Sequence, residues 1–250
     1  MAVFKAALIN ELEKLYKKKK ALAAIILSLT VIIVGQLMIW GVRSGFGIRG
    51  AGSGEFPILV LSVVINIVLP LFAALVAIDS FSGEFAHNII RVTLTRPVSR
   101  FKIFSAKVTA ITIFILFNLL LIFVFSVIIG LIFNYDSMTL LGLGKSFLAY
   151  MVSLLPLLVL VLGIIFLTHI LKSGISVFFA AVLLFVASEV LSLIFPQYAG
   201  LLITSHLSWY KLWFAHTFPL QAVIRELLLM MGYAIMLFVA GFYLFERKEF

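Results

Sequence analysis

The sequence contains no cysteine, which excludes disulfide bonds, thiolate metal sites and a cysteine nucleophile. Charged residues are also scarce, at 12% of the 250 residues, and the 10 acidic residues are outnumbered by 19 basic ones. Soluble domains carry about a quarter charged residues, whereas this chain is 64% hydrophobic with a mean hydropathy of +1.26. The composition predicts a membrane protein with no room for a separate soluble domain.

Patterns for catalysis or nucleotide binding are missing as well. Gly144–Ser146 resembles the end of a phosphate-binding loop, but Thr139 stands where that loop requires a glycine. A loop lysine at the entrance of a membrane span is the simpler interpretation of Lys145. The histidines lack a spacing to carboxylates that would form a metal site, and no basic region is interleaved with base-reading side chains. We therefore predict no catalytic residue, metal site, cofactor or nucleic-acid partner on this chain.

Six apolar runs are long enough to cross the hydrocarbon core, which takes about 20 residues. They predict an all-α membrane protein with a single domain over residues 21–250. The third helix is expected to begin early, near Ser99, because Arg100 and Lys107 are seven residues apart and share a face. Pro70 and Pro156 are expected to kink the second and fourth spans. The predicted spans are 21–42, 57–78, 108–133, 147–170, 175–195 and 227–245.

The positions of the basic residues predict the orientation of the chain in the membrane. If the amino terminus is inside, the inner segments hold 14 of the 19 lysines and arginines, and the outer segments hold five. We therefore expect a protein of the plasma membrane with both termini in the cytoplasm. The segment 79–107 and the tail 246–250 are expected on the cytoplasmic side. Residues 43–56 and 134–144 are expected outside.

Two further segments are expected to lie at the membrane surface. Residues 1–20 predict an amphipathic interfacial helix with one apolar stripe and lysines for anionic lipid, and a solvated basic tail is the alternative. Residues 196–226 are too apolar for a solvated loop, and they predict short re-entrant or interfacial helices before the last span. The stripe of the first segment is Phe4, Leu8, Leu12 and Leu15, and the aromatics of the second include Tyr198, Trp209, Tyr210, Trp213, Phe214 and Phe218.

Polar residues inside apolar spans are candidates for a transport pathway. Glu189 lies in the fifth span, where it is either functional or a cap near the outer end within reach of Arg225. Asn66 and Asn118 lie in the second and third spans, where hydrogen bonding between helices is the alternative role.

The longest polar interruption of the chain is the segment 79–107. Ser80, Ser82 and Gly83 are expected to end the second span there. Residues 84–94 then predict a short helix with an apolar stripe of Phe85, Ile89 and Val92, and Pro97 prevents this helix from continuing. A short helix held between two spans can transmit a push from another protein, and an ordinary interfacial loop is the alternative.

The segment resembles the ABC-2 type transporter permeases. The resemblance rests on Asp79 at the end of the second span, Ser82–Glu84 after it, the Arg-Pro-Val-Ser-Arg run of residues 96–100, and Lys107 seven residues later. The layout of an amino-terminal basic helix, six spans and an apolar excursion before the last span is also similar. The resemblance implies a type V fold and a coupling helix that binds an ATPase, with Glu84, Phe85, Ile89, Arg91, Val92, Arg96, Pro97 and Arg100 as coupling residues.

A member of this family is expected to be the permease subunit of a bacterial ATP-driven exporter. The resemblance implies two permease subunits, identical or related, and two copies of a separate cytoplasmic ATPase that binds ATP and Mg²⁺. The apolar spans favour a hydrophobic or amphipathic cargo such as a peptide, drug or lipid. A stand-alone secondary transporter or channel is the main alternative, although it requires more charges within the membrane than Glu189 alone. A membrane-embedded enzyme and a sensor or scaffold are the weaker alternatives.

Overall fold

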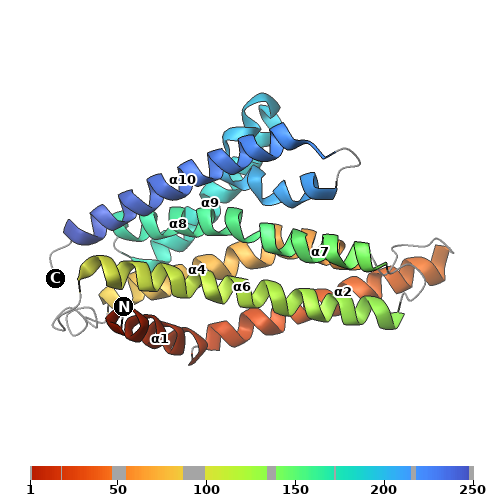
Figure 1. Ribbon diagram of the computed structural model, residues 1–250, viewed down its shortest axis with the longest axis horizontal. Coiled ribbons are helices and arrows are strands. Elements are labelled where there is room, and N and C mark those ends of the chain that lie inside the picture. Colours follow the sequence, from red (N-terminus) through yellow and green to blue (C-terminus); the bar gives the residue numbers. More distant parts are fainter. Residues whose placement is uncertain are drawn as a thin grey trace.

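The described part of the protein is helical throughout and is organised as a bundle of long, roughly aligned helices (Figure 1). The structure is a computed structural model that describes residues 2–17, 19–46, 55–86, 99–133, 139–171, 173–214 and 218–247. Six stretches are long and apolar enough to span a membrane, which confirms the predicted number of spans. They are Leu22–Gly41, Phe56–Gly83, Arg100–Phe133, Leu140–Ile170, Gly174–Ile194 and Leu220–Arg247.

The helices begin and end at residues that partly differ from the predicted boundaries. As predicted, α6 begins at Arg100 and runs to Phe133. The second span ends at Gly83, as predicted, but the helix does not break at Ser80–Gly83, because α4 continues through these residues to Ala86. The other elements are α1 (Ala2–Lys17), α2 (Lys19–Phe46), α3 (Phe56–Val63), η1 (Val64–Val68), α4 (Leu69–Ala86), α7 (Leu140–Val152), α8 (Leu154–Ile170), α9 (Gly174–Ile194), η3 (Pro196–Leu201), η4 (Ile203–Phe214) and α10 (Leu220–Arg247).

Two further predictions need correction. Lys145 lies in α7 and not in a loop, because the fourth span begins at Leu140. The excursion before the last span is shorter than predicted, because residues 220–226 already belong to α10. Its described part consists of η3 and η4, which are short 3₁₀ segments. Residues 47–54 and 134–138 of the predicted loops lie outside the described residues.

Both predicted proline positions coincide with a departure from regular α-helix. The π-helical turn η1 ends at Val68, two residues before Pro70, and proline cannot donate a hydrogen bond to the carbonyl of Asn66. Pro156 similarly leaves the carbonyl of Val152 without its usual donor, and α7 ends at that residue before α8 begins at Leu154. The second span is therefore assembled from three consecutive helical pieces, α3, η1 and α4, and the fourth span from two, α7 and α8.

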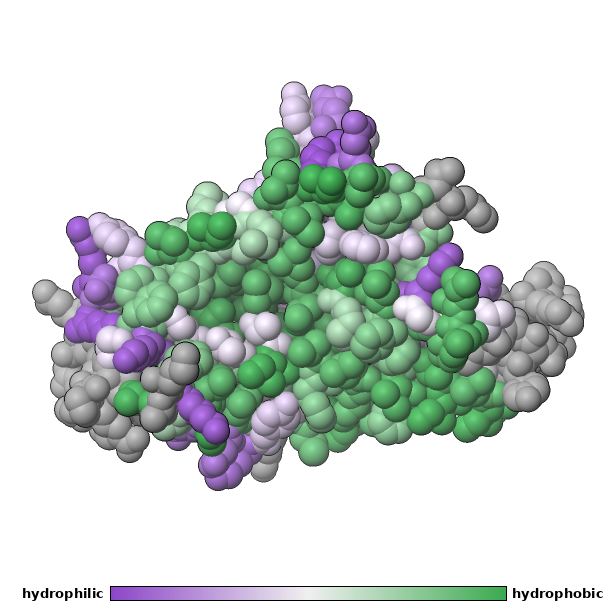
Figure 2. Space-filling view, viewed as in Figure 1, coloured by the Kyte–Doolittle hydropathy of each residue, from purple (hydrophilic) through white to green (hydrophobic). Residues whose placement is uncertain are grey.

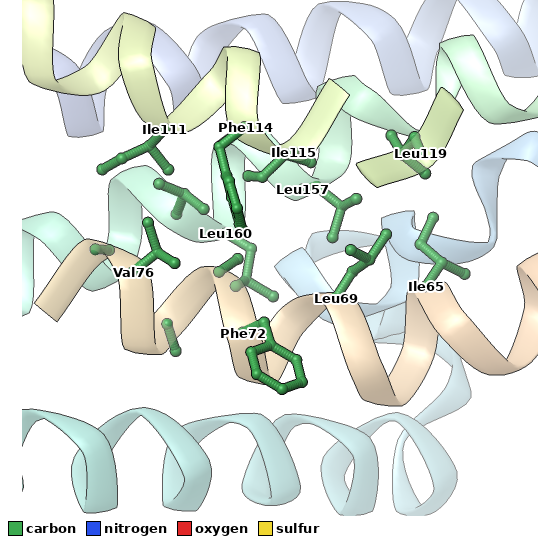
Figure 3. Packing of buried hydrophobic residues seen from close by; sticks show 14 of the residues in the cluster. Ile65, Leu69, Phe72, Val76, Ile111, Phe114, Ile115, Leu119, Leu157 and Leu160 are labelled. Atoms are coloured by element: carbon green, nitrogen blue, oxygen red, sulfur yellow. The ribbon is translucent and has the colours of Figure 1, made fainter. Parts of the chain in front are cut away.

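The hydrophobic core lies between the second, third and fourth spans (Figure 3). Side chains of η1 and α4 meet side chains of α6 and α8 there. By contrast, α9 and α10 leave wide apolar faces exposed, since only 6% and 11% of the residues in their most apolar stretches are buried. The space-filling view shows apolar side chains over most of the visible face, with hydrophilic residues gathered mainly toward the edges (Figure 2). The core residues shown are Ile65, Leu69, Phe72, Val76, Ile111, Phe114, Ile115, Leu119, Leu157 and Leu160.

The start of α1 and the end of α10 lie at the same end of the bundle, which we name the basal end (Figure 1). The basal end holds α1, the end of α4, the start of α6 and the end of α10. The opposite end, which holds the start of α3, the start of α7 and η4, is named the distal end. Leu8, Leu12 and Leu15 of the predicted apolar stripe pack α1 against the core cluster. The contact of α1 with lipid stays a prediction.

Candidate functional site

The basal end is held together by a cluster of aromatic rings from four helices. Phe81 of α4 lies 5.5 Å from Phe104 of α6 and 5.4 Å from His169 of α8, measured between ring centroids. Phe245 of α10 lies 5.6 Å from Phe104. Phe238 and Phe242 of α10 add rings 5.2 and 5.8 Å from Phe104. We name Phe81, Phe104, His169, Phe238, Phe242 and Phe245 the basal aromatic cluster.

Most of these rings meet edge to face or tilted, the geometries that aromatic pairs favour beyond simple burial. Phe81, Phe104 and Phe245 are almost completely buried. His169 is half-buried, and its Nδ1 lies 2.7 Å from the backbone carbonyl of Ile165. The sequence predicts His169 as an interfacial residue, and the structure packs its ring against Phe81, Phe104 and Phe245.

Two glycines allow the helices at the basal end to approach closely. A Cβ atom on Gly174, the first residue of α9, would lie 3.0 Å from Cγ2 of Ile78 in α4. A Cβ atom on Gly241 of α10 would lie 3.4 Å from Cζ of Phe104. Side chains at these positions would push α9 and α10 away from α4 and α6. The basal contacts therefore join α4, α6, α8, α9 and α10 into one packed unit.

A buried ion pair connects α1 to the same unit. Nζ of Lys107 in α6 lies 2.8 Å from Oε2 of Glu11, and the two side chains are only 1% and 7% exposed. Nζ of Lys14 lies 2.9 Å from the other carboxylate oxygen of Glu11. Lys107 also lies 5.9 Å from the ring centroid of Phe81, within the range of a cation–π interaction. Lys107 thus contacts three elements: its own helix α6, α1 and the end of α4.

Sequence reasoning singled out Lys107 but missed its partner. Glu11 follows Leu8 by three residues and precedes Leu15 by four, so it lies within the apolar stripe of α1 and not opposite it. A carboxylate on an apolar helical face that packs against a bundle requires a buried partner, because an isolated buried charge is very costly. This spacing was the available signal.

Three of the predicted coupling residues, Glu84, Phe85 and Arg100, lie in described helices that contribute to the basal end. Arg100 begins α6, and its guanidinium donates a hydrogen bond to the backbone carbonyl of Glu246 in α10. Glu84 and Phe85 belong to the last turn of α4. The remaining coupling residues, Ile89, Arg91, Val92, Arg96 and Pro97, lie outside the described residues.

The predicted pathway residues are not brought together into one site. Asn66 is half-buried and donates to the carbonyl of Ser62 at 2.7 Å. Asn118 is fully buried in α6 and donates to the carbonyl of Phe114 at 2.8 Å, whereas its Oδ1 has no partner among the described residues. Glu189 is exposed on α9, and the described residues contain no ion pair between it and Arg225. No hydrogen bond in the described structure joins these three side chains.

The distal end carries a second set of polar groups, on η4. His206 is buried, and its Nδ1 lies 3.5 Å from a carboxylate oxygen of Glu226 in α10. Burial raises the pKa of Tyr210. Five buried polar side-chain atoms of η4 have no partner among the described residues, on Thr204, His206, Trp209, Tyr210 and Trp213.

A pocket of about 450 Å³ opens between η4 and the start of the second span. Its walls are mainly apolar, with one acidic and one basic residue among them. Among the described residues, no group of three or more histidines and carboxylates is placed to hold a metal ion. The pocket is lined by Glu55, Ile58, Leu59, Ser62, Tyr210, Lys211 and Phe214.

The six spanning helices define the chain as an all-helical, multi-pass membrane protein. Residues 7–188 match the family described as "ABC-2 family transporter protein", which covers most of the chain, and the protein therefore belongs to this family. ABC-2 permeases are transmembrane transport subunits that are not themselves catalytic. The family match confirms the resemblance that the segment 79–107 indicated.

A shorter similarity links the chain to a bacterial protein. It is 35% identical over 68 residues to "Uncharacterized protein YhcI" of Bacillus subtilis (strain 168). The matched region covers 27% of this chain and 22% of the relative, so the chain spans about a fifth of the length of the curated relative that it matches.

Proposed function

We propose that the protein is the permease subunit of an ATP-driven exporter, and that a separate cytoplasmic ABC ATPase drives it through residues 84–94, the predicted coupling helix. Membership of the ABC-2 family supports the division between a membrane chain and an ATPase chain. In this proposal ATP and Mg²⁺ are bound by the ATPase. Two ATPase copies act on two permease subunits, and the exposed apolar faces of α9 and α10 offer surface for lipid or a second subunit.

The arrangement of the basal end is the observation that carries this proposal. Residues 87–98 connect α4 to α6, and Phe81 and Phe104 lie near the two ends of that connection. A push on the segment reaches both helix ends, and the basal aromatic cluster passes the displacement to α8 and α10. Packed helices move as units because their interfaces are not continuously deformable.

A hydrophobic or amphipathic cargo, such as a peptide, drug or lipid, suits the apolar spans. Asn118 and Asn66 are the pathway candidates that lie within the bundle. Glu189 is a candidate for the face that a second permease subunit would cover, since it is exposed on α9 of the single chain. The polar groups of η4 without partners support a change of contacts at the distal end during export.

The first test of this proposal is dependence on a partner. The chain purified alone should not hydrolyse ATP, and the ABC ATPase encoded beside it should co-purify with it and hydrolyse ATP in the complex. ATP hydrolysis by the permease after removal of every other protein would contradict the proposal. Cargo movement driven by an ion gradient without any ATPase would favour the secondary transporter instead.

The second test concerns orientation, which the basic residues predict. Single cysteines are introduced at residues 50 and 99 of this cysteine-free chain, and intact cells are treated with a membrane-impermeant maleimide. Residue 50 should react from outside, and residue 99 only after the membrane is opened. The reverse pattern would place the basal end outside the cell and remove the ATPase from its reach.

A further inference from the structure

The buried pair of Glu11 and Lys107 is difficult to explain by stability alone. Two charges lose their hydration on burial, and apolar side chains of similar volume in the same place often give an equally stable fold. Lys107 is 1% exposed and Glu11 is 7% exposed, so the pair is well removed from water. Leucine or methionine at position 11 would continue the apolar stripe of α1, and at position 107 it would fill the facing site on α6. A role in fixing the position of α1 is one that the pair can supply and apolar packing cannot.

A buried charge pair of this kind fixes the position of one helix relative to the other, in addition to attracting them. An apolar stripe tolerates sliding along its partner, whereas Nζ of Lys107 meets Oε2 of Glu11 at 2.8 Å in only one register of α1 on α6. Single polar contacts in otherwise apolar helix interfaces set register in this way. Tyr16, five residues further along α1, packs its ring against Phe114 and Phe117 of α6 at centroid distances of 6.2 and 5.7 Å.

The position of Lys107 links the register of α1 to the two helix ends on which the ATPase is proposed to act. The lysine lies two helical turns after Arg100, where α6 begins, and its ammonium faces the ring of Phe81 near the end of α4. The same side chain therefore touches both helix ends that flank residues 87–98, and it holds α1 at that place.

We propose that Glu11 is a positioning residue that makes α1 part of the unit moved by the ATPase. This inference rests on the proposed function. In this arrangement α1 moves together with the basal ends of α4 and α6 as one rigid body. When the ATPase displaces the connection between α4 and α6, the amino-terminal helix α1 is displaced as well. Without the charge of Glu11, α1 stays folded on the bundle but no longer keeps one register, and part of the displacement is lost.

The chain offers a matched control on the same helix. Glu13 pairs with Lys17 at 3.3 Å, but these side chains are 61% and 79% exposed, and exposed pairs contribute little. The test variants are Glu11→Gln and Lys107→Met, and the control is Glu13→Gln. A double variant, Glu11→Met with Lys107→Met, removes the buried pair while keeping the site filled; it leaves Lys14, which is 31% exposed and can turn to water. Lys107→Arg keeps the charge of the pair.

The experiment uses the complex with its ATPase in liposomes of phosphatidylethanolamine and phosphatidylglycerol. Spin labels at residues 5 and 102, both exposed, report the distance between α1 and α6 without nucleotide and with a non-hydrolysable ATP analogue. The reaction rate of a cysteine at residue 211 reports the distal response to the analogue. Wild type, Glu13→Gln and Lys107→Arg should keep one distance in both states and show the full distal response.

In Glu11→Gln the distance should broaden and depend on nucleotide, and the distal response should fall by about fivefold or more with the ATPase still bound. The double methionine variant should fold as stably as wild type and show the same loss. A full distal response in that variant would overturn the inference, because packing alone would then suffice. If wild type fails to bind the ATPase or to respond to the analogue, the proposed function itself fails.

Discussion

Replacing Phe104 with alanine should lower the free energy of unfolding by about 3–5 kcal/mol, the range measured for removal of a buried aromatic ring. Phe104 is fully buried, and rings of α4, α8 and α10 surround it within 6.2 Å between centroids. The cavity left by its removal has no simple way to close, because Gly241 supplies no side chain on the facing helix. Thermal unfolding in detergent measures the effect.

Phe125→Ala is the matched control for this prediction. Phe125 lies on the same helix but is 41% exposed, so its removal leaves no enclosed cavity. Thermal stability should fall much less in this variant. Equal losses in the two variants would mean that the basal aromatic cluster does not hold the helix ends together, and the proposed path of the displacement would lose its structural basis.

Ile89→Asp and Phe85→Ala should each weaken binding of the ATPase by roughly 30-fold or more. Truncation of a buried anchor in an interface typically costs about 2 kcal/mol or more, and 1.4 kcal/mol is tenfold in affinity. The predicted stripe of Phe85, Ile89 and Val92 lies between two spans and not within one, so membrane insertion and protein level should stay normal. Co-purification of the ATPase with each variant measures the effect, alongside export.

Trp213→Ala provides the control at the distal end. Trp213 is half-buried in η4 and packs against Trp209 at a centroid distance of 5.6 Å, so its loss disturbs local packing far from residues 87–98. ATPase binding should be unchanged in this variant. If Phe85→Ala and Ile89→Asp both keep full ATPase binding and full export, the segment is an ordinary loop.

The sequence was sufficient to predict the helices that cross the membrane. Length and apolarity identify a span without knowledge of its neighbours, and Arg100 and Lys107 on one face correctly predicted where α6 begins. The second span ends at Gly83 as predicted, but the expected break of the helix at Ser80–Gly83 is absent, because α4 continues to Ala86. Small polar residues favour a helix end only where nothing packs on them, and Ser80 and Ser82 are buried within α4, with Ser82 beside Gly174.

The contacts of the basal end were not predictable in the same way. The rings of Phe81, Phe104, His169 and Phe245 come from positions far apart in the chain, and each is one of many aromatics in apolar helices. Their meeting depends on how four helices pack, which periodicity within one helix does not define. Glu11 is the exception, although its role was missed. A carboxylate between Leu8 and Leu15 on one helical face is a signal for a buried cationic partner.

The central claim is that residues 84–94 are the place where a separate ATPase acts on this membrane chain. Its most direct test is a photo-reactive amino acid at residue 89, irradiated in the complex of permease and ATPase in membranes. A second sample carries the same group at residue 145, which is exposed in α7 at the distal end. The proposal predicts a covalent adduct with the ATPase from residue 89 and none from residue 145. An intact complex that gives no ATPase adduct from residue 89, or equal adducts from both positions, would contradict it.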